Sequence, residues 1–229
     1  MTVVSVHLAD VGFPASLGII RHVPRAGEIG GLRNANIGIA ARFTGSAMPN
    51  PIIGRVGLIG FWDNELALKQ FETNHPLAGK LDDGWRVRAH PLRMHGSWPG
   101  MPADVPKQRA VSHDGPVLVL TLAHTKLTRL PAFLKTNTQA EAAVVKAPGN
   151  IFAMGIARPP RVESVSLWES TEASIDYAFS GSQPGHPEAM KVDQAKPFHH
   201  ESAFIRLAID EVAGSLGGGT PLAADAVLL

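Results

Sequence analysis

GFWDNELALKQFETNHP (residues 60–76) and SLWESTEASIDYAFSGSQPGHP (residues 166–187) are two similar phrases, and they predict one structural unit that occurs twice in this chain. Each phrase starts with a short apolar stretch around a tryptophan and ends on a His-Pro pair. Between these points lies a polar turn followed by residues with helical spacing. Because the repeat is about half the length of the chain, we expect two fused modules and not a solenoid.

Strand and helix signals around the two phrases occur in the same order in both halves. In the first half we expect strands at 3–11, 32–43, 55–62 and 84–94, with helices at 15–22 and from the predicted N-cap Asn64 onward. In the second half we expect strands at 116–125, 150–157, 162–168 and 202–209, with helices at 127–147 and 171–179. Each half is therefore predicted to be a ferredoxin-like β-α-β-β-α-β repeat.

The two fused repeats are expected to form one α+β barrel. A four-stranded sheet with both helices on one face leaves its other face uncovered, and two such sheets can cover each other. We place an N-terminal repeat at residues 1–98, a linker at 99–115, a C-terminal repeat at 116–212 and a flexible tail at 213–229. The space between the sheets is then the natural pocket for an apolar ligand or cofactor.

The composition limits the possible functions. The chain has 229 residues, of which 45% are hydrophobic, so it is long enough to bury a sizeable core. A net charge of +1 without a basic run disfavours a nucleic-acid partner. The absence of cysteine excludes thiolate nucleophiles, zinc–thiolate sites and iron–sulfur clusters, so any metal chemistry would use the 10 histidines and the carboxylates. The sequence also lacks phosphate-binding loops, dinucleotide-binding glycine motifs and serine-hydrolase elbows.

The N-terminal sequence and the hydropathy pattern predict a cytoplasmic protein. MTVVSVHLADV (residues 1–11) alternates like a strand and has no basic leader, which disfavours a signal peptide. No apolar run reaches the roughly 18–20 residues that a membrane-spanning helix needs. We therefore expect a protein without a transmembrane segment.

Three short phrases resemble the spheroidene monooxygenase family of carotenoid-modifying enzymes and its bacterial relatives. They are SLWES (166–170), HPEAM (186–190) and GSWPG (96–100), and the similarity extends over about residues 3–209. The resemblance implies a dimeric-type α+β barrel related to the antibiotic-biosynthesis monooxygenases, with bound haem b and with dioxygen as co-substrate. It also implies oxygenation of a C–H bond in an apolar substrate such as a carotenoid. The phrase KPFHHESAF (196–204) departs from the family pattern.

Under this resemblance, a histidine is expected to hold the haem iron. The chain has no cysteine, and its one tyrosine, Tyr177, lies on a predicted helix where a core position is more natural. His186 is the expected metal ligand, because a loop that contains proline and glycine presents it. His199 and His200 begin a predicted strand, so their side chains point to opposite faces, and one of them would bind the cofactor or act as a distal acid/base. The alternative for all three histidines is an exposed, structural position.

Further residues are expected around the cofactor. Trp98 would line the cofactor pocket, with core packing as the alternative. Arg158 and His124 would be catalytic, because a cation or an imidazole on the distal side of a haem polarises bound dioxygen. For these two residues the alternative is a position that faces solvent. His75 occupies in the first phrase the place that His186 holds in the second, and it is expected to be structural.

These observations favour a haem-dependent, monooxygenase-like oxidoreductase whose electron donor the sequence does not identify. Three alternatives stay open: a cofactor-free monooxygenase of the antibiotic-biosynthesis type, another haem-barrel chemistry such as aldoxime dehydration or peroxide decomposition, and a non-catalytic lipid or pigment carrier. A homodimer also stays open, although two fused repeats already supply both sheets within one chain.

Overall fold

The computed structural model of the chain describes residues 1–46, 48–108, 111, 113–179 and 198–216. The elements of the first half are β1 (Val3–Asp10), α1 (Phe13–Arg21), β2 (Leu32–Arg42), β3 (Asn50–Trp62), α2 (Glu65–Asn74), α3 (Pro76–Leu81) and β4 (Trp85–Gly96). Those of the second half are β5 (Val117–Thr125), η1 (Leu127–Arg129), α4 (Leu130–Lys146), β6 (Asn150–Arg158), β7 (Arg161–Trp168), α5 (Thr171–Phe179) and β8 (His199–Ala213). The element order is the expected one, except that α3 is an additional short helix.

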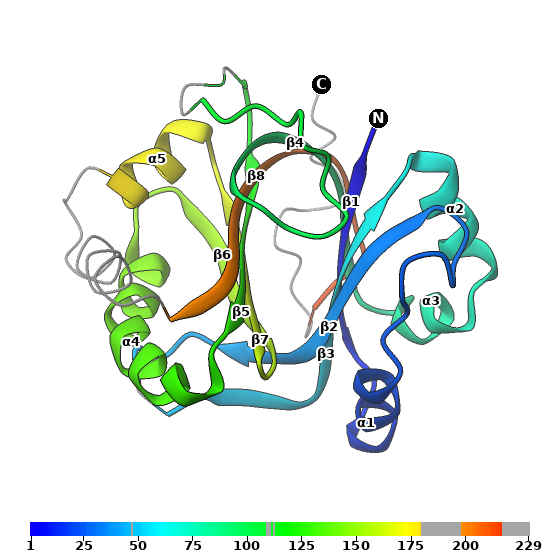
Figure 1. The fold of residues 1–229 in the computed structure, drawn as a ribbon, viewed down its shortest axis with the longest axis horizontal. Helices are drawn as coiled ribbons and strands as arrows, with labels where there is room; N and C mark the ends of the chain where they lie inside the picture. The colour runs from blue at the N-terminus through cyan, green and yellow to red at the C-terminus, as the bar shows by residue number, and fades with distance from the viewer. Residues whose placement is uncertain (47, 109–110, 112, 180–197, 217–229) are drawn as a thin grey trace.

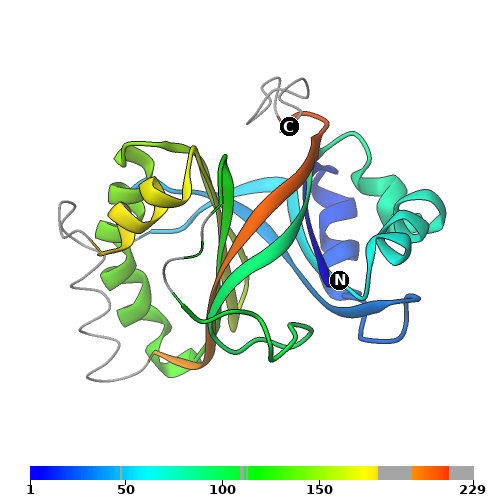
Figure 2. The same cartoon turned by 90° about the horizontal axis from the view of Figure 1, so that it is seen from above.

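The strands close into one antiparallel barrel in the order β1-β3-β2-β6-β7-β5-β8-β4. Each half contributes a four-stranded ferredoxin-like sheet, β4-β1-β3-β2 from the first and β8-β5-β7-β6 from the second. Helices α1, α2 and α3 lie on one side of the barrel, and α4 and α5 lie on the opposite side (Figures 1 and 2). The predicted fold class, two fused ferredoxin-like repeats in an α+β barrel, is confirmed.

The strand register shows that the two halves are related by an approximate two-fold axis. The first residue of β1 faces the last residue of β3, Val3 opposite Trp62, and the pair Val117 and Trp168 does the same in the second half. The halves meet along two seams, β2 with β6 and β4 with β8. At the β4–β8 seam His90 faces Ala208, and these two residues hold equivalent positions in their repeats. The contact between equivalent edges is that of a two-fold dimer, made within one chain.

The two tryptophans that mark the repeat anchor the helices to the sheets. Trp62 Nε1 donates a hydrogen bond to Ser5 Oγ over 2.9 Å, and the Trp168 indole donates to a serine, Ser166, over the same distance. An aromatic residue of the covering helix lies on each indole, with ring centroids 4.9 Å apart for Phe71 on Trp62 and 5.1 Å apart in the second half. Both halves therefore use the same buried tryptophan, satisfied by a hydroxyl and covered by a helix.

The serines that accept these two hydrogen bonds come from different strands. Ser5 lies on β1 and faces Gly60 on β3. In the second half the roles are exchanged, because Ser166 lies on β7 and faces Val119 on β5. A Cβ at Gly60 would lie 2.7 Å from Trp62 Nε1, so the first half cannot carry a second side chain there without a shift. Each tryptophan therefore has one serine hydroxyl as its acceptor, although that serine comes from a different strand in each half.

Side chains fill the interior of the barrel. Phe61, Trp85 and Leu118 face inward from three strands and are fully buried, and Trp98 and Val105 from the segment after β4 pack against the same core. A fully buried side chain touches neither solvent nor a water-sized void, and an eight-stranded barrel is just wide enough to be filled in this way. The described side chains thus form a packed core in the space where we expected an open apolar pocket between the two sheets.

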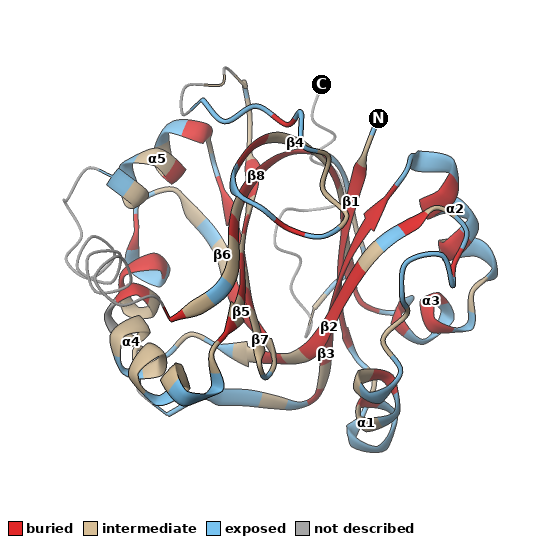
Figure 3. Ribbon diagram, viewed as in Figure 1, coloured by how far each residue is buried: buried red, intermediate tan, exposed pale blue. Residues whose placement is uncertain are grey.

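Buried residues follow the strands, whereas the helices carry many exposed residues and α4 is mostly of intermediate burial (Figure 3). A second core lies between the first sheet and α1, α2 and α3, and a third lies between the second sheet and the helices α4 and α5. In the part of the chain that the structure describes, no helix is long and apolar enough to cross a membrane.

Candidate functional site

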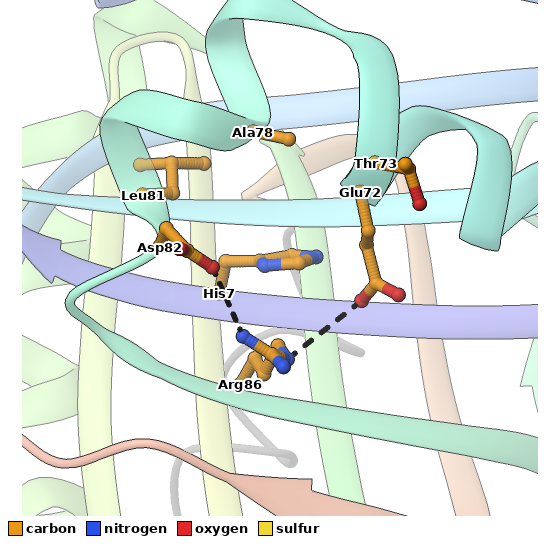
Figure 4. A pocket seen from close by; sticks show the side chains of 7 residues that line it. All are labelled: His7, Glu72, Thr73, Ala78, Leu81, Asp82 and Arg86. Atoms are coloured by element: carbon orange, nitrogen blue, oxygen red, sulfur yellow. Dashed lines mark hydrogen bonds and ion pairs between the residues drawn. The ribbon is translucent and has the colours of Figure 1, made fainter.

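A pocket of about 240 Å³ lies between the first sheet and the helices that cover it. Its lining comes from β1, α2, α3 and the start of β4, namely from His7, Glu72, Thr73, Ala78, Leu81, Asp82 and Arg86 (Figure 4). A water molecule takes about 30 Å³ of liquid, so the pocket has room for a ligand of modest size. We call it the His7 pocket.

The break between α2 and α3 shapes the roof of this pocket. Asn64 begins α2 as predicted, because its Oδ1 accepts a hydrogen bond from the backbone N–H of Ala67 over 3.0 Å. His75 ends α2 and begins α3, since its Nδ1 accepts from the Leu77 N–H over 3.2 Å and Pro76 follows as the first helical residue. His75 thus has the structural role expected for it, and the bend it makes sets the two helices side by side over β1.

His7 lies at the floor of the pocket. Its neighbours on β1, Val6 and Leu8, point into the barrel, so His7 points to the helices, where its ring meets the ring of Phe71 edge-on at 6.1 Å. The residue is 3% exposed, and its Nε2 has no hydrogen-bond partner among the described residues. Burial, with a smaller contribution from the nearby Arg86 charge, lowers the pKa of His7 to about 4. The imidazole is therefore neutral at pH 7.

Glu72 and Arg86 provide the charged side of the pocket. Arg86 Nε lies 4.0 Å from Glu72 Oε1, and Arg86 Nη1 lies 3.3 Å from Asp82 Oδ1. Burial raises the pKa of Glu72 above its ordinary value, although the Arg86 charge acts against this shift. The two pKa shifts have opposite directions. The imidazole of His7 is a weaker base than usual, and the carboxylate of Glu72 in the same pocket is a stronger one.

The second half does not carry this set of residues. His7 faces Arg86 across β1 and β4, and the equivalent facing pair on β5 and β8 is Thr121 and Phe204. The residue that follows the helix aromatic is Glu72 in the first half and Ala178 in the second. The His7 pocket is therefore a property of one repeat only.

Three residues predicted from the sequence to surround a cofactor are described by the structure. Trp98 follows β4, Arg158 ends β6 and His124 lies near the end of β5. Trp98 is 4% exposed and belongs to the barrel core, with the guanidinium carbon of Arg161 5.9 Å from its ring centroid. Arg158 Nε donates to the Ile37 carbonyl over 3.2 Å. The ring of His124 lies 5.5 Å from that of His200. The cofactor-binding or catalytic roles of these residues stay predictions.

The two adjacent histidines at the start of β8 have different surroundings. His199 packs edge-on against Phe133 of α4, with ring centroids 5.3 Å apart. His200 is exposed and lies beside His124 on the other side of the strand. Their opposite orientations agree with the prediction. His186, the predicted metal ligand, lies outside the described residues, so its ligation stays a prediction.

One buried carboxylate was not identified from the sequence. Glu163 on β7 is 3% exposed, and neither of its carboxylate oxygens has a hydrogen-bond partner among the described residues. Burial raises its pKa to about 8, while Arg161 and Arg158 act in the opposite direction. Both oxygens are shielded from solvent, so Glu163 titrates among the packed side chains of the barrel.

The His7 pocket does not lie between the two sheets, and it does not have the size that a haem needs. The inward-facing side chains pack in the space between the sheets. Pockets for small molecules usually have volumes of about 300–1,000 Å³, and a porphyrin is a large ligand. Within the described ranges, no cluster of three or more histidine, aspartate or glutamate side chains is arranged to hold a metal ion. A lipid or pigment carrier that bound its ligand inside the barrel would need the same space.

No protein-family model matches the chain, and no curated protein matches it. Several solved structures are similar to it at low sequence identity. They include an aldoxime dehydratase in complex with butyraldoxime (9% identity, 91% of this chain and 79% of that chain, TM-score 0.48), a candidate monooxygenase from Fusobacterium nucleatum subsp. nucleatum (7%, 96% and 95%, TM-score 0.42) and a heme-degrading enzyme from Listeria monocytogenes (13%, 89% and 98%, TM-score 0.30). Likenesses this distant do not transfer an activity to this chain.

Proposed function

We propose that this chain is a monooxygenase-type enzyme that acts on a small polar substrate in the His7 pocket without a cofactor inside the barrel. The observation that carries the proposal is the pairing of a buried, neutral imidazole with a carboxylate of raised pKa in one pocket. Opposite pKa shifts of two groups in one site are typical of an acid/base pair. The reaction class is removal of a proton next to a carbonyl group or from a phenol.

Each of the three polar groups has a role in this reaction. Glu72 is the base, because its raised pKa brings its proton affinity closer to neutral pH, where general bases work best. His7 is neutral, and its Nδ1 would donate a hydrogen bond to the substrate oxygen on which negative charge develops, because its Nε2 is shielded from solvent. Arg86 borders both residues and stabilises the resulting anion by its charge.

The anion is electron-rich enough to reduce dioxygen itself, as the cofactor-free alternative from the sequence requires. In balanced form, a CH2 group and O2 give a C=O group and water. The substrate carbon loses four electrons and two hydrogens, one oxygen atom enters the product and the other leaves as water. No external electron donor is needed. The protein contributes proton transfer and charge stabilisation, and the substrate is the reductant.

The proposal is tested in two steps with a panel of small aryl ketones and phenols. Without oxygen and in D2O, the protein should catalyse deuterium exchange at the acidic carbon of at least one ketone, followed by NMR. With oxygen, the same compound should be oxidised with consumption of one O2 per molecule. Glu72→Gln should remove both activities, whereas Ala178→Gln, at the equivalent position of the second half, should keep them. Exchange that survives in Glu72→Gln would refute the assignment of the base.

A haem-dependent oxygenation, in which His186 would hold the haem, is the second proposal. The phrases SLWES, HPEAM and GSWPG favour it through their resemblance to a haem-dependent family. The haem would have to lie outside the filled barrel interior, and it would supply the oxygen activation. A protein produced with haem available should then show a Soret band that His186→Ala removes and His7→Ala retains. A colourless protein that oxidises a ketone or phenol supports the first proposal and contradicts the second.

A further inference from the structure

We infer that Glu211, on β8 of the second half, is a positioning residue of the His7 pocket, because it holds Arg88 away from Glu72. The inference rests on the proposed role of Glu72 as the base. It means that a site carried by one repeat is completed by the other repeat across the β4–β8 seam.

Two carboxylates hold Arg88 in place. Arg88 faces Glu211 directly across the β4–β8 seam, and its Nη2 lies 3.0 Å from Glu211 Oε2. Its Nη1 lies 2.9 Å from Glu65 Oε1, at the start of α2. Both arms of the guanidinium are thus committed to carboxylates other than Glu72, and planar guanidinium groups favour such paired contacts.

Glu72 and Glu211 border the same small space. A gap of about 10 Å³, roughly enough for one water molecule, is lined by Glu72, Arg86, Arg88 and Glu211. Arg88 is therefore near enough to Glu72 to pair with it if Glu211 were neutral. Direct repulsion adds to this effect, since the Glu211 charge raises the pKa of Glu72 and the Arg88 charge lowers it.

The charged environment of Glu72 includes groups from every element packed around it. These are Lys69 on its own helix, Arg86 and Arg88 on β4, Glu211 on β8, His7 on β1, and Asp82 after α3. Among these six residues, Glu211 is the one that the second half supplies. A substitution at Glu211 should therefore change the pKa of Glu72 while the sequence of the first repeat stays the same.

The inference is tested by following the carboxyl carbon of Glu72 by ¹³C NMR as a function of pH in the folded protein without substrate. In Glu211→Gln the titration should move to lower pH, because the Nη2 arm of Arg88 loses its partner and can pair with Glu72, and because one negative charge is lost. In Arg88→Gln it should move to higher pH. Asp210→Asn is the matched control: Asp210 pairs with His90 over 2.7 Å, and its loss should leave Glu72 unchanged.

The double variant Glu211→Gln/Arg88→Gln separates positioning from simple repulsion. If Glu211 acts by holding Arg88, its neutralisation should have a clearly smaller effect once Arg88 is absent. An equal shift with and without Arg88, or no shift in Glu211→Gln, would overturn the inference. These titrations need no turnover, so a protein that shows them but catalyses no exchange would refute the proposed function and retain this inference.

Discussion

The two halves of the barrel share a framework and differ in chemistry. Both carry the buried tryptophan with its hydroxyl acceptor, and both have the same strand order and equivalent seams. At the positions where the first half has His7, Glu72 and Arg86, however, the second has Thr121, Ala178 and Phe204. The repeated residues are those that stabilise the fold, whereas the polar pocket residues are unique to one copy. A duplicated module can therefore keep its framework while a single copy carries the site.

The strongest test of this contrast places glutamine at the equivalent positions of α2 and α5. Removal of a general base usually costs about 10²- to 10⁴-fold in rate, so Glu72→Gln should lower the deuterium exchange rate by that factor. The matched variant Ala178→Gln should stay within about twofold of the wild type. The measurement is the exchange rate in D2O with one fixed ketone. Equal losses in both variants would mean that the pocket is not what separates the halves.

The second prediction concerns the shared framework. Truncating a buried aromatic side chain costs about 3–5 kcal/mol, so Trp62→Ala and Trp168→Ala should each lower the free energy of unfolding by that amount. Because the strands form one closed barrel, each variant should unfold in a single transition by urea titration. Two separate transitions would show that the halves are independent domains.

The third prediction uses an interior position at which the two halves differ. Glu163 on β7 holds the position that Gly57 holds on β3, since they face Leu122 and Leu8 respectively. The pKa of Glu163 is raised to about 8 in the folded protein, so the folded state retains this proton longer than the unfolded state. The stability that this proton contributes is present below pH 4.5 and is lost as the pH rises through about 8.

Glu163→Gln should therefore be more stable than the wild type by a few kcal/mol at pH 9, and similar to it at pH 4. Urea titrations at the two pH values measure this difference. The loss of stability at acid pH should persist in the variant. Below pH 6.5 the unfolded state binds a proton at His7, whereas in the folded state the pKa of His7 is lowered to about 4. An alkaline loss of stability that is identical in both proteins would contradict the buried, protonated state of Glu163.

The smallest expected effect concerns the exchanged serines. Ser5→Ala and Ser166→Ala each leave a buried indole N–H without its acceptor, which costs about 1–3 kcal/mol. The two variants should lose similar stability, although the serines come from different strands of their repeats. Thermal unfolding in parallel with the wild type is sufficient to compare them. A clear loss in only one variant would show that the two hydrogen bonds are not equivalent.

The fold could be predicted from the sequence because local patterns determine it. The alternation in 3–11, the repeated tryptophan phrases and the N-cap Asn64 each reflect chemistry within a few residues. The short helix α3 was missed, because six residues that start with proline give too little periodicity. The filled interior could not be foreseen either, since it depends on how large residues such as Trp85 and Trp98 meet across the closed barrel.

The candidate site was not predictable for a related reason. His7, Glu72 and Arg86 come from a strand, a helix and a second strand, and no motif links them in the sequence. The available signal was His7 itself, an ionisable residue on the helix-facing side of a strand whose inward side is apolar. The histidine-rich phrase 196–204 instead predicted a site in the second half, where His199 and His200 lie on opposite sides of β8.

The central claim, that the first half alone carries the ligand site, is tested most directly by mapping where a small phenolate binds. Histidine ¹⁵N and glutamate ¹³C chemical shifts would be followed during the titration. The account predicts that His7 and Glu72 respond together, and that His124, His200 and Glu163 remain unchanged. Shifts confined to the second half, with His7 silent at saturation, would contradict it.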